Sequence, residues 1–183
     1  MSAWSYFRTT VADVDEIRDD LWNDQITAQK YSETGARYQA AILEQYKMYV
    51  EMADRISARR AAANAFFLSL NTAELAVAAG VWQAREISAW ALLVPLPVLV
   101  VQAATWFWLI RSYRQLNSAK YAVVGALEER LPASPYWRAE WHALGAGKDA
   151  SRYWPLTHLE QGLPIAFLTL YLFGALAALI FAG

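Results

Sequence analysis

Three long apolar runs, separated by polar stretches, dominate the pattern of this chain. They cover residues 61–82, 89–110 and 163–183. Each run has the roughly 20 residues that an α-helix needs to cross the ~30 Å hydrocarbon core of a bilayer. The pattern therefore predicts an all-α integral membrane protein with about three transmembrane helices, and it argues against a soluble bundle with buried core helices.

The alternation also predicts how the chain is organised. The expected segments are a cytoplasmic N-terminal helical region (1–60), two transmembrane helices with a short outer loop (61–110), a cytoplasmic helical region (111–160) and a third transmembrane helix (161–183). No Pro or Gly lies between Ala36 and Ala79, so one helix can run from the N-terminal region into the first span. The segment from Ser32 to Gly35 is a plausible break before that helix.

Basic residues flank the predicted spans on one side. They are Arg55, Arg59 and Arg60 before the first span, Arg111, Arg114 and Lys120 after the second, and Lys148 and Arg152 before the third. Lys and Arg near span ends favour the cytoplasmic side, which puts the N-terminus inside and the C-terminus outside. Arg8 and the acidic residues that follow it exclude a signal peptide at the N-terminus. Trp82, Trp90, Trp106 and Trp108 are expected at the membrane interfaces.

A heptad-like seam precedes the first span. Ile42, Tyr46, Tyr49, Ala53 and Ile56 recur at spacings of four and three over about two heptads. Such a seam predicts a helix that packs on a partner, and we expect it to serve as an oligomer seam.

Composition excludes several classes of function. The net charge is −1, so no overall basic field attracts nucleic acid. There is no cysteine, and the two histidines, His142 and His158, lie on separate segments, which argues against a metal site. No Ser/His/Asp set, Walker loop, HExxH or GxGxxG motif is present. We therefore expect neither an enzyme nor a bound cofactor.

One face of the first predicted span carries polar residues. Asn64, Asn71 and Glu74 lie within about 80° of one another at 100° per residue. A carboxylate near the bilayer centre costs about 2.5–3.5 kcal/mol on insertion scales. This stripe either lines a lumen or ion path, or joins helices through hydrogen bonds with a neutral Glu74. Gln102 and Thr105 of the second span are candidate partners.

Two further groups of residues have candidate roles. Arg111, Arg114 and Asn117 recur at a spacing of three just after the second span, where they contact lipid phosphate or an anionic ligand or simply snorkel to set the topology. An aromatic cluster comprises Tyr136, Trp137, Trp141, Tyr153 and Trp154. A small core or a membrane-surface contact explains this cluster better than a ligand site does.

Part of the chain resembles a known family. The stretches concerned are residues 43–73 (LEQYKMYVEMADRISARRAAANAFFLSLNTA), 112–121 (SYRQLNSAKY) and 156–160 (LTHLE). They resemble the RipA family of octameric bacterial membrane proteins, and the resemblance runs from Leu43 to the C-terminus. It implies an inner-membrane homo-oligomer, by the family description an octamer, and no known reaction. Glu74 departs from the apolar residue expected there. A more distant likeness is to the SLATT membrane effectors, which place two spans before cytosolic helices.

These observations support several hypotheses about function. The first is a homo-oligomeric bacterial inner-membrane protein that acts as a scaffold or pore-like effector in stress, defence or host-associated fitness. The alternatives are a membrane-anchored binding module, which senses a ligand or docks a cytosolic protein, and a channel or transporter for a small solute or ion. The expected partners are other copies of the chain, membrane lipid and a cytosolic protein, with no nucleic acid.

Overall fold

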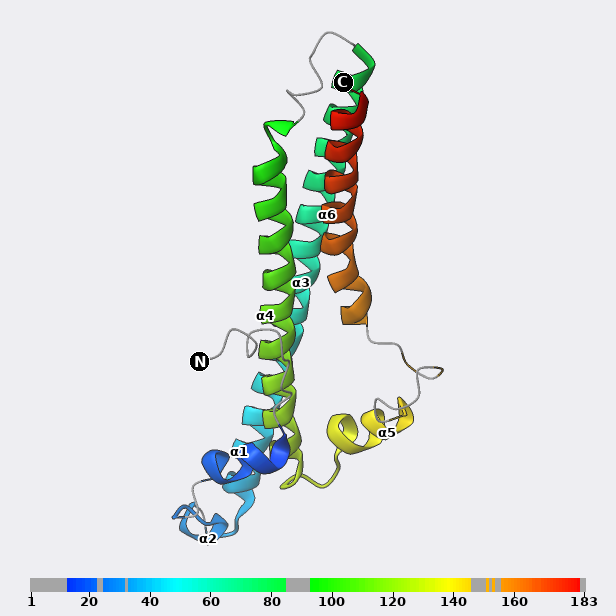
Figure 1. The fold of residues 1–183 in the computed structure, drawn as a ribbon. Coiled ribbons are helices and arrows are strands. Elements are labelled where there is room, and N and C mark those ends of the chain that lie inside the picture. The colour runs from blue at the N-terminus through cyan, green and yellow to red at the C-terminus, as the bar shows by residue number, and fades with distance from the viewer. Residues whose placement is uncertain are drawn as a thin grey trace. The chain divides into compact units, whose positions relative to one another are not determined.

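The computed structural model describes residues 13–22, 25–31, 33–84, 93–145, 151, 153 and 156–181. Its elements are α1 (Val14–Leu21), α2 (Ala28–Tyr31), α3 (Ala36–Ala84), α4 (Leu96–Glu128), η3 (Pro135–Glu140), α5 (Trp141–Ala143) and α6 (Leu156–Phe181) (Figure 1). These described residues contain no β-strand, which confirms the predicted all-α class.

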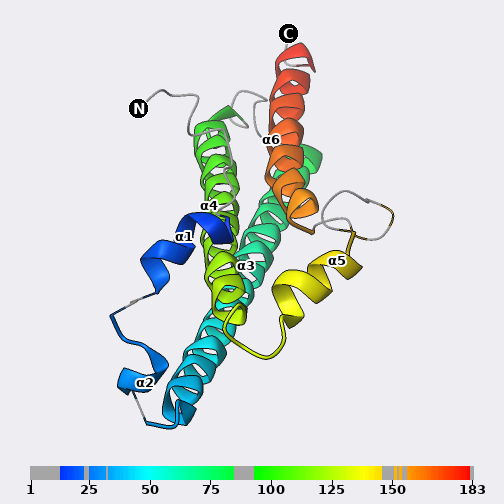
Figure 2. The same ribbon diagram turned by 90° about the horizontal axis from the view of Figure 1, so that it is seen from below.

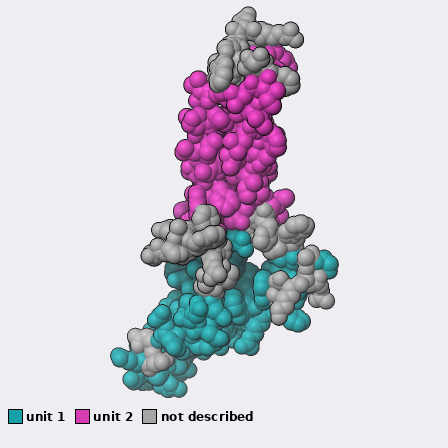
Figure 3. Space-filling model, viewed as in Figure 1, with its two compact units in different colours: residues 1–58, 113–154 teal, residues 59–112, 155–183 magenta. Residues whose placement is uncertain are grey.

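The chain divides into two compact units. Unit 1 comprises residues 1–58 and 113–154, and unit 2 comprises residues 59–112 and 155–183 (Figure 3). Helices α3 and α4 contribute one part of their length to each unit. Each unit is described below by itself.

Helix α3 is a single continuous helix of 49 residues. At 1.5 Å per residue this corresponds to a length of roughly 70 Å. It follows Gly35, whose φ of 69° lies in the left-handed region that glycine adopts without strain. This confirms the predicted break near Gly35 and the predicted continuation of the N-terminal region into the first span.

Helix α4 begins later than the sequence pattern suggests. It starts at Leu96, whereas the predicted span began at Ala89, which lies outside the described residues. Proline explains this start, because the residue before a proline disfavours helical geometry and Pro97 falls in the first turn, where no N–H is needed. The N–H of Leu99 donates to the carbonyl of Pro95 at 3.1 Å.

Two described helices, Ala36–Gln83 and Leu159–Ile180, are long and apolar enough to cross a membrane. They contain most of the first and third predicted spans. The apolar part of α4 within the described residues, 96–110, is shorter than the roughly 20 residues of a full crossing. A crossing by the second predicted span therefore stays a prediction.

Unit 2 is a bundle of three helices formed by α6 and by parts of α3 and α4. Four contacts define its directions: Asn64–Trp106 and Glu74–Gln102 between α3 and α4, and Asn71–Tyr171 and Arg60–Glu160 between α3 and α6. Later residues of α3 pair with earlier residues of α4, so these helices are antiparallel, whereas α3 and α6 run in the same direction. Figures 1 and 2 both show α6 beside this part of α3.

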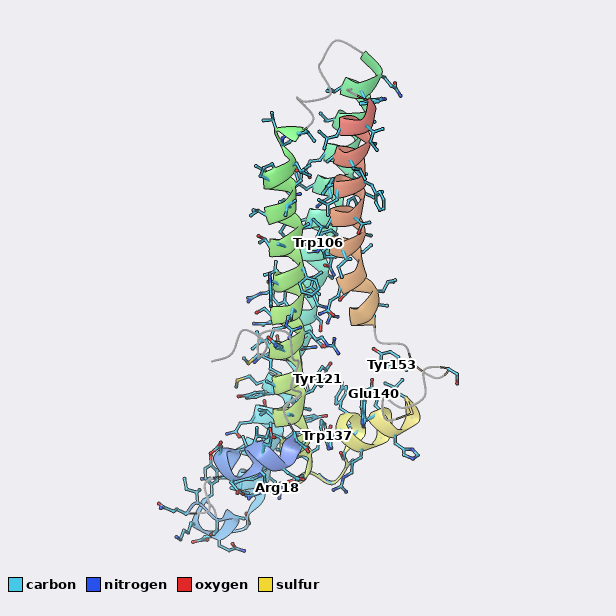
Figure 4. All side chains as sticks on the ribbon, in the orientation of Figure 1. Arg18, Trp106, Tyr121, Trp137, Glu140 and Tyr153 are labelled. Atoms are coloured by element: carbon cyan, nitrogen blue, oxygen red, sulfur yellow. The ribbon has the colours of Figure 1, made fainter. Side chains whose placement is uncertain are left out.

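Trp106 is the centre of the unit 2 core. Its side chain is fully buried, it stacks on Phe67 with 5.6 Å between ring centroids, and Phe167 lies 6.0 Å from it (Figure 4). The expectation that the Trp106 indole lies at a membrane interface is therefore wrong, because this side chain is buried between the helices of unit 2. Trp108, two residues later, is 39% exposed and remains available to an interface.

Unit 1 is built on the first part of α3 and the last part of α4, again antiparallel, with α1 beside them. The carboxylate of Asp13 caps α1 and accepts a hydrogen bond from the N–H of Val14. The buried core contains Val14, Ile42, Ala53, Ile56, Ala122, Val124, Ala126 and Leu127.

Candidate functional site

A layer of hydrogen-bonded polar side chains lies inside unit 2. We call it the polar layer; its members are Asn64, Asn71, Glu74, Gln102, Trp106 and Tyr171. All three helices of the bundle contribute to it. Because lipid offers no hydrogen bonds, polar groups of membrane helices are satisfied by neighbouring helices.

Asn71 is the most buried member of the polar layer, with no exposed surface. Its amide nitrogen donates to the carbonyl of Phe67 at 2.7 Å, and its oxygen accepts from the hydroxyl of Tyr171 at 2.5 Å. The Tyr171 hydroxyl also lies 3.4 Å from Oε2 of Glu74. Asn71 therefore joins α3 to α6 through a short chain of hydrogen bonds.

Glu74 joins α3 to α4. Its Oε2 atom accepts a hydrogen bond from Nε2 of Gln102 at 2.8 Å. Asn64 makes a second bridge between these helices, because its Oδ1 accepts from Nε1 of Trp106 at 2.9 Å. The structure thus brings all three stripe residues to partners on other helices of the same chain.

Thr105 does not reach the polar layer. Its hydroxyl donates to the carbonyl of Val101 on its own helix at 2.8 Å. Thr72 and Thr169 make the same kind of bond, to Leu68 and Ile165. These threonines satisfy themselves locally, so they can face lipid or another subunit without an unpaired hydroxyl.

Charged residues mark one end of unit 2. Nε of Arg60 on α3 lies 3.2 Å from Oε2 of Glu160 on α6, and both side chains are largely buried. Arg111 on α4 is only 7% exposed, and within the described part of the chain its Nε and Nη2 atoms are buried without a hydrogen-bond partner. The ring of Trp108 lies beside Arg111, with its centroid 5.7 Å from the Arg111 guanidinium carbon.

Arg114 and Asn117, which the sequence grouped with Arg111, belong to unit 1. Nδ2 of Asn117 lies 3.5 Å from the hydroxyl of Ser57, a weak contact between α4 and α3, and its Oδ1 is buried without a partner. Arg114 is half-buried. The structure therefore gives these residues separate surroundings.

The seam before the first span packs within the chain. Ile42, Ala53 and Ile56 are at most 7% exposed, although only this one chain is present. Tyr46 donates to Glu128 on α4 at 3.1 Å, and Nζ of Lys120 on α4 lies 5.2 Å from the Tyr49 ring. Helix α4 of the same chain thus supplies a partner helix of the kind that the heptad spacing requires, and a role of the seam between subunits stays a prediction.

Glu128 is the residue that sequence analysis missed. It is 2% exposed, and its carboxylate accepts four hydrogen bonds: from Tyr46 at 3.1 Å, from the hydroxyl of Ser134 at 2.6 Å and from the N–H groups of Tyr136 and Trp137 at 3.0 Å each. A carboxylate at the start of a helix satisfies N–H groups that have no partner within the helix. Glu128 therefore holds the start of η3 against α3 and α4.

This environment perturbs Tyr46. Burial, together with the neighbouring Glu128 carboxylate, raises the pKa of the Tyr46 hydroxyl above its usual value. On the other side of the same turn, hydrogen bonds from the Arg18 guanidinium lower the pKa of Glu129. Arg18 thereby ties α1 to the end of α4.

The aromatic cluster forms the wall of a cavity of about 380 Å³ in unit 1. The lining residues are Ser118, Tyr121, Tyr136, Trp137, Glu140, Trp141, Leu144 and Tyr153. Figure 4 shows Tyr121 on α4 and Trp137, Glu140 and Tyr153 around the same space. Trp154 lies outside the described residues. Among the described residues, the lining combines aromatic faces with the Glu140 carboxylate, which is the chemistry that binds a cation.

The model of the octameric membrane protein family (8xMP) matches residues 43–180. The chain belongs to this family. No curated protein and no solved structure matches it. The chain is therefore a homo-oligomeric membrane protein of an octameric family, as the resemblance implied.

The family match covers the polar layer, Glu128 and the aromatic cavity, but not α1 and α2. In this member of the family, α1 is attached by Arg18, which bonds Glu129, and by Val14, which lies against Gly125. Trp22, just after α1, lies under the Arg130 guanidinium at 3.6 Å. These contacts connect a segment outside the family region to residues within it.

Proposed function

We propose that this chain is a non-enzymatic structural subunit that builds an octameric scaffold in the bacterial inner membrane. The family supports assembly in a membrane. The scaffold role is supported by one observation above all: the polar side chains of the polar layer bond to one another inside a single subunit. A bundle fastened in this way is a rigid unit that can be packed side by side.

The same observation disfavours a pore lined by the polar stripe. A lumen between subunits needs polar side chains on the outer face of the bundle. Asn71 has no exposed surface. Glu74 and Asn64 are partly buried, and they accept hydrogen bonds from Gln102 and Trp106, respectively. Many outward-facing residues of the same helices are instead large and apolar, among them Phe66, Val77, Val98, Val101 and Phe173. The exposed Thr72, Thr105 and Thr169 donate their hydroxyls to carbonyls of their own helices.

Reconstitution separates scaffold from pore. Purified protein in liposomes should show the octamer by native mass measurement and no ion flux above that of empty vesicles. Glu74→Gln should leave both results unchanged. A cation flux in the parent that Glu74→Gln alters, with the octamer intact in both, would replace the scaffold by a channel.

The proposed orientation rests on the basic flanks of the spans, which put the N-terminus in the cytoplasm and the C-terminus outside. An alkaline phosphatase fused to the C-terminus should be active, and a green fluorescent protein fused there should be dark. The reverse pair of results would contradict the orientation, whereas the scaffold does not depend on it.

The aromatic cavity of unit 1 favours a second candidate, a binding module for a cationic group. Aromatic faces attract cations through their quadrupole, and Glu140 adds a formal negative charge. Titration with tetramethylammonium should change the fluorescence of the parent protein, and Trp141→Ala should reduce that change. A response that Trp141→Ala leaves intact would place the cation elsewhere.

A further inference from the structure

The guanidinium of Arg111 in unit 2 is buried, and two of its three nitrogen atoms lack hydrogen-bond acceptors among the described residues. The side chain is 7% exposed, and both Nε and Nη2 are buried without a hydrogen-bond partner among the residues that the structure describes. These two nitrogens share one edge of the planar guanidinium, so their N–H groups point the same way. That edge matches the spacing of two oxygens of a carboxylate or phosphate, which it binds bidentately.

Arg111 cannot avoid the cost of burying a charge by losing its proton, because arginine stays protonated in proteins. A buried cation without a counter-ion is strongly destabilising. The Trp108 ring, at 5.7 Å, offers a cation–π contact but accepts no hydrogen bond at Nε or Nη2. An anion at this edge would both neutralise the charge and accept the hydrogen bonds of Nε and Nη2.

The register of the bundle shows that the local charge is unbalanced. The Asn64–Trp106 bond aligns α3 with α4, and one turn further toward the same end come Arg60 on α3 and Arg111 on α4. Glu160 supplies one carboxylate there, and it lies 3.2 Å from Arg60. Among the largely buried charges of the described residues here, two cations, Arg60 and Arg111, face one anion, Glu160, which leaves one buried positive charge in excess.

Unit 2 of a second copy of the chain is a poor source of the missing anion. Within the described residues of unit 2 the carboxylates are Glu74 and Glu160. Glu74 accepts from Gln102 in the polar layer, and Glu160 pairs with Arg60. The described part of a neighbouring unit 2 therefore has no carboxylate left over for Arg111.

The bilayer, in contrast, supplies phosphate groups at this level when α4 crosses it as predicted. Arg111 is the first charged residue after the apolar residues 96–110 of α4, and the indole of Trp108 beside it is 39% exposed, as expected at the boundary between acyl chains and headgroups. We propose that Arg111 binds the phosphate of an anionic phospholipid through Nε and Nη2. This site depends on the predicted insertion of α4 into the membrane and stands whether or not the assembly is a scaffold.

The test uses the octamer purified in neutral detergent and stripped of lipid. Phosphatidylglycerol should raise the apparent melting temperature, and native mass measurement should show up to one retained lipid per subunit. Arg111→Gln should weaken the lipid dependence by about 10- to 100-fold, since hydrogen bonds between charged groups contribute on this scale. Arg111→Lys keeps the charge but loses the bidentate edge, so its lipid dependence should lie between that of the parent and that of Arg111→Gln. An intact octamer in Arg111→Lys would show that the residue can be replaced without loss of the fold.

Arg59→Gln is the matched control, because Arg59 is an exposed cation in the same unit and should leave the lipid effect unchanged. Arg111→Leu removes the unpaired charge, so without lipid it should melt above the parent and gain nothing from phosphatidylglycerol. Inorganic phosphate at millimolar concentration should not reproduce the effect of the lipid.

Three results would overturn the proposal. The first is a phosphatidylglycerol effect that survives in both Arg111→Gln and Arg111→Leu. The second is an equal effect of inorganic phosphate, which would make the site one for a free anion. The third is loss of the octamer in Arg111→Gln together with no lipid effect on the parent, which would assign the anion to a neighbouring subunit.

Discussion

Two glutamates, one in each unit, show how differently a carboxylate can be used inside one chain. Glu128 in unit 1 is 2% exposed and accepts four hydrogen bonds, two of them from backbone N–H groups. Glu74 in unit 2 is only partly buried and accepts one short bond, from Gln102, with the Tyr171 hydroxyl 3.4 Å away. The first organises backbone, and the second links side chains.

The difference teaches which contacts can be replaced. Backbone N–H groups at the start of η3 cannot find another acceptor without refolding the turn, so Glu128 is required for that local structure. The partners of Glu74 are side chains with alternatives, because Tyr171 also donates to Asn71. We therefore expect substitutions near Glu128 to cost more than substitutions near Glu74.

The largest effect should come from Glu128→Ala. It leaves the N–H groups of Tyr136 and Trp137 and the hydroxyls of Tyr46 and Ser134 without their acceptor, which should cost about 3–5 kcal/mol. Hydrogen exchange of residues 129–145 in the purified octamer should become fast. Glu51→Ala, which removes an exposed carboxylate paired with Arg55 on the same helix, should leave exchange unchanged. If Glu128→Ala left the hydrogen exchange of residues 129–145 unchanged, Glu128 would not be required for the structure of this turn.

Gly125→Ala should come next, because it disturbs the packing beside Glu128. An added Cβ would lie 2.8 Å from ring atoms of Trp137 and 2.9 Å from Val14. Overpacking of this kind should cost about 2–3 kcal/mol. Gly174→Ala in α6, where a Cβ meets nothing within 4 Å, is the control and should be neutral or slightly stabilising. Apparent melting temperatures of the two variants provide the measurement, and equal temperatures would argue against close packing at Gly125.

In unit 2, Glu74→Leu should cost about 1–2 kcal/mol, because it orphans the Gln102 amide while Tyr171 keeps Asn71 as acceptor. Glu74→Gln should be nearly silent, since glutamine keeps an oxygen acceptor of the same reach. Thermal melting beside native mass would show both. If Glu74→Gln proved as damaging as Glu128→Ala, the two carboxylates would be equivalent after all.

The smallest effect is expected for Tyr46→Phe, about 1 kcal/mol at pH 8 from the lost bond to Glu128. The raised pKa of Tyr46 means that the folded protein keeps a proton which the unfolded chain releases near pH 10. This contribution to stability is thus full below pH 10 and is lost as pH rises further. The parent and Tyr46→Phe should therefore converge in melting temperature above pH 10.

Tyr49→Phe is the control for that pH series. Tyr49 lies on the same seam and is half-buried, and within the described residues its hydroxyl makes no hydrogen bond. Tyr49→Phe, measured over the same pH range, shows what the loss of a tyrosine hydroxyl without this hydrogen bond does to the melting temperature. A Tyr46→Phe difference that stays constant between pH 8 and pH 11 would remove the pH argument but not the hydrogen bond.

Much of the fold could be predicted from local pattern. Run length and apolarity decide a membrane helix, because roughly 20 apolar residues match the bilayer whatever surrounds them. The continuous α3, the turn at Gly35 and the cap at Asp13 follow from backbone preferences that act within a few residues. These features need no knowledge of what the helix will pack against.

Glu128 shows what local pattern leaves undecided. In the sequence it precedes Glu129 and Arg130 and looks like part of a solvated charged stretch. Only the return of the chain through η3 brings backbone N–H groups to its carboxylate. The burial of the Glu128 carboxylate results from the geometry of the turn, which cannot be predicted from the spacing of residue types.

The same limit applies to partners. Gln102 and Thr105 lie three residues apart, about 60° from each other around α4, and both types can hydrogen-bond to Glu74. Packing turned Gln102 toward Glu74, while Thr105 bonds its own helix. The seam from Ile42 to Ile56 likewise predicted that a partner helix packs there, but not that α4 of the same chain is this helix.

The sequence determined which faces need partners, because burial of apolar and polar groups is a property of residue type. The tertiary structure decided which partners they meet, because that depends on helix rotation and register, which are fixed by contacts far apart in the chain.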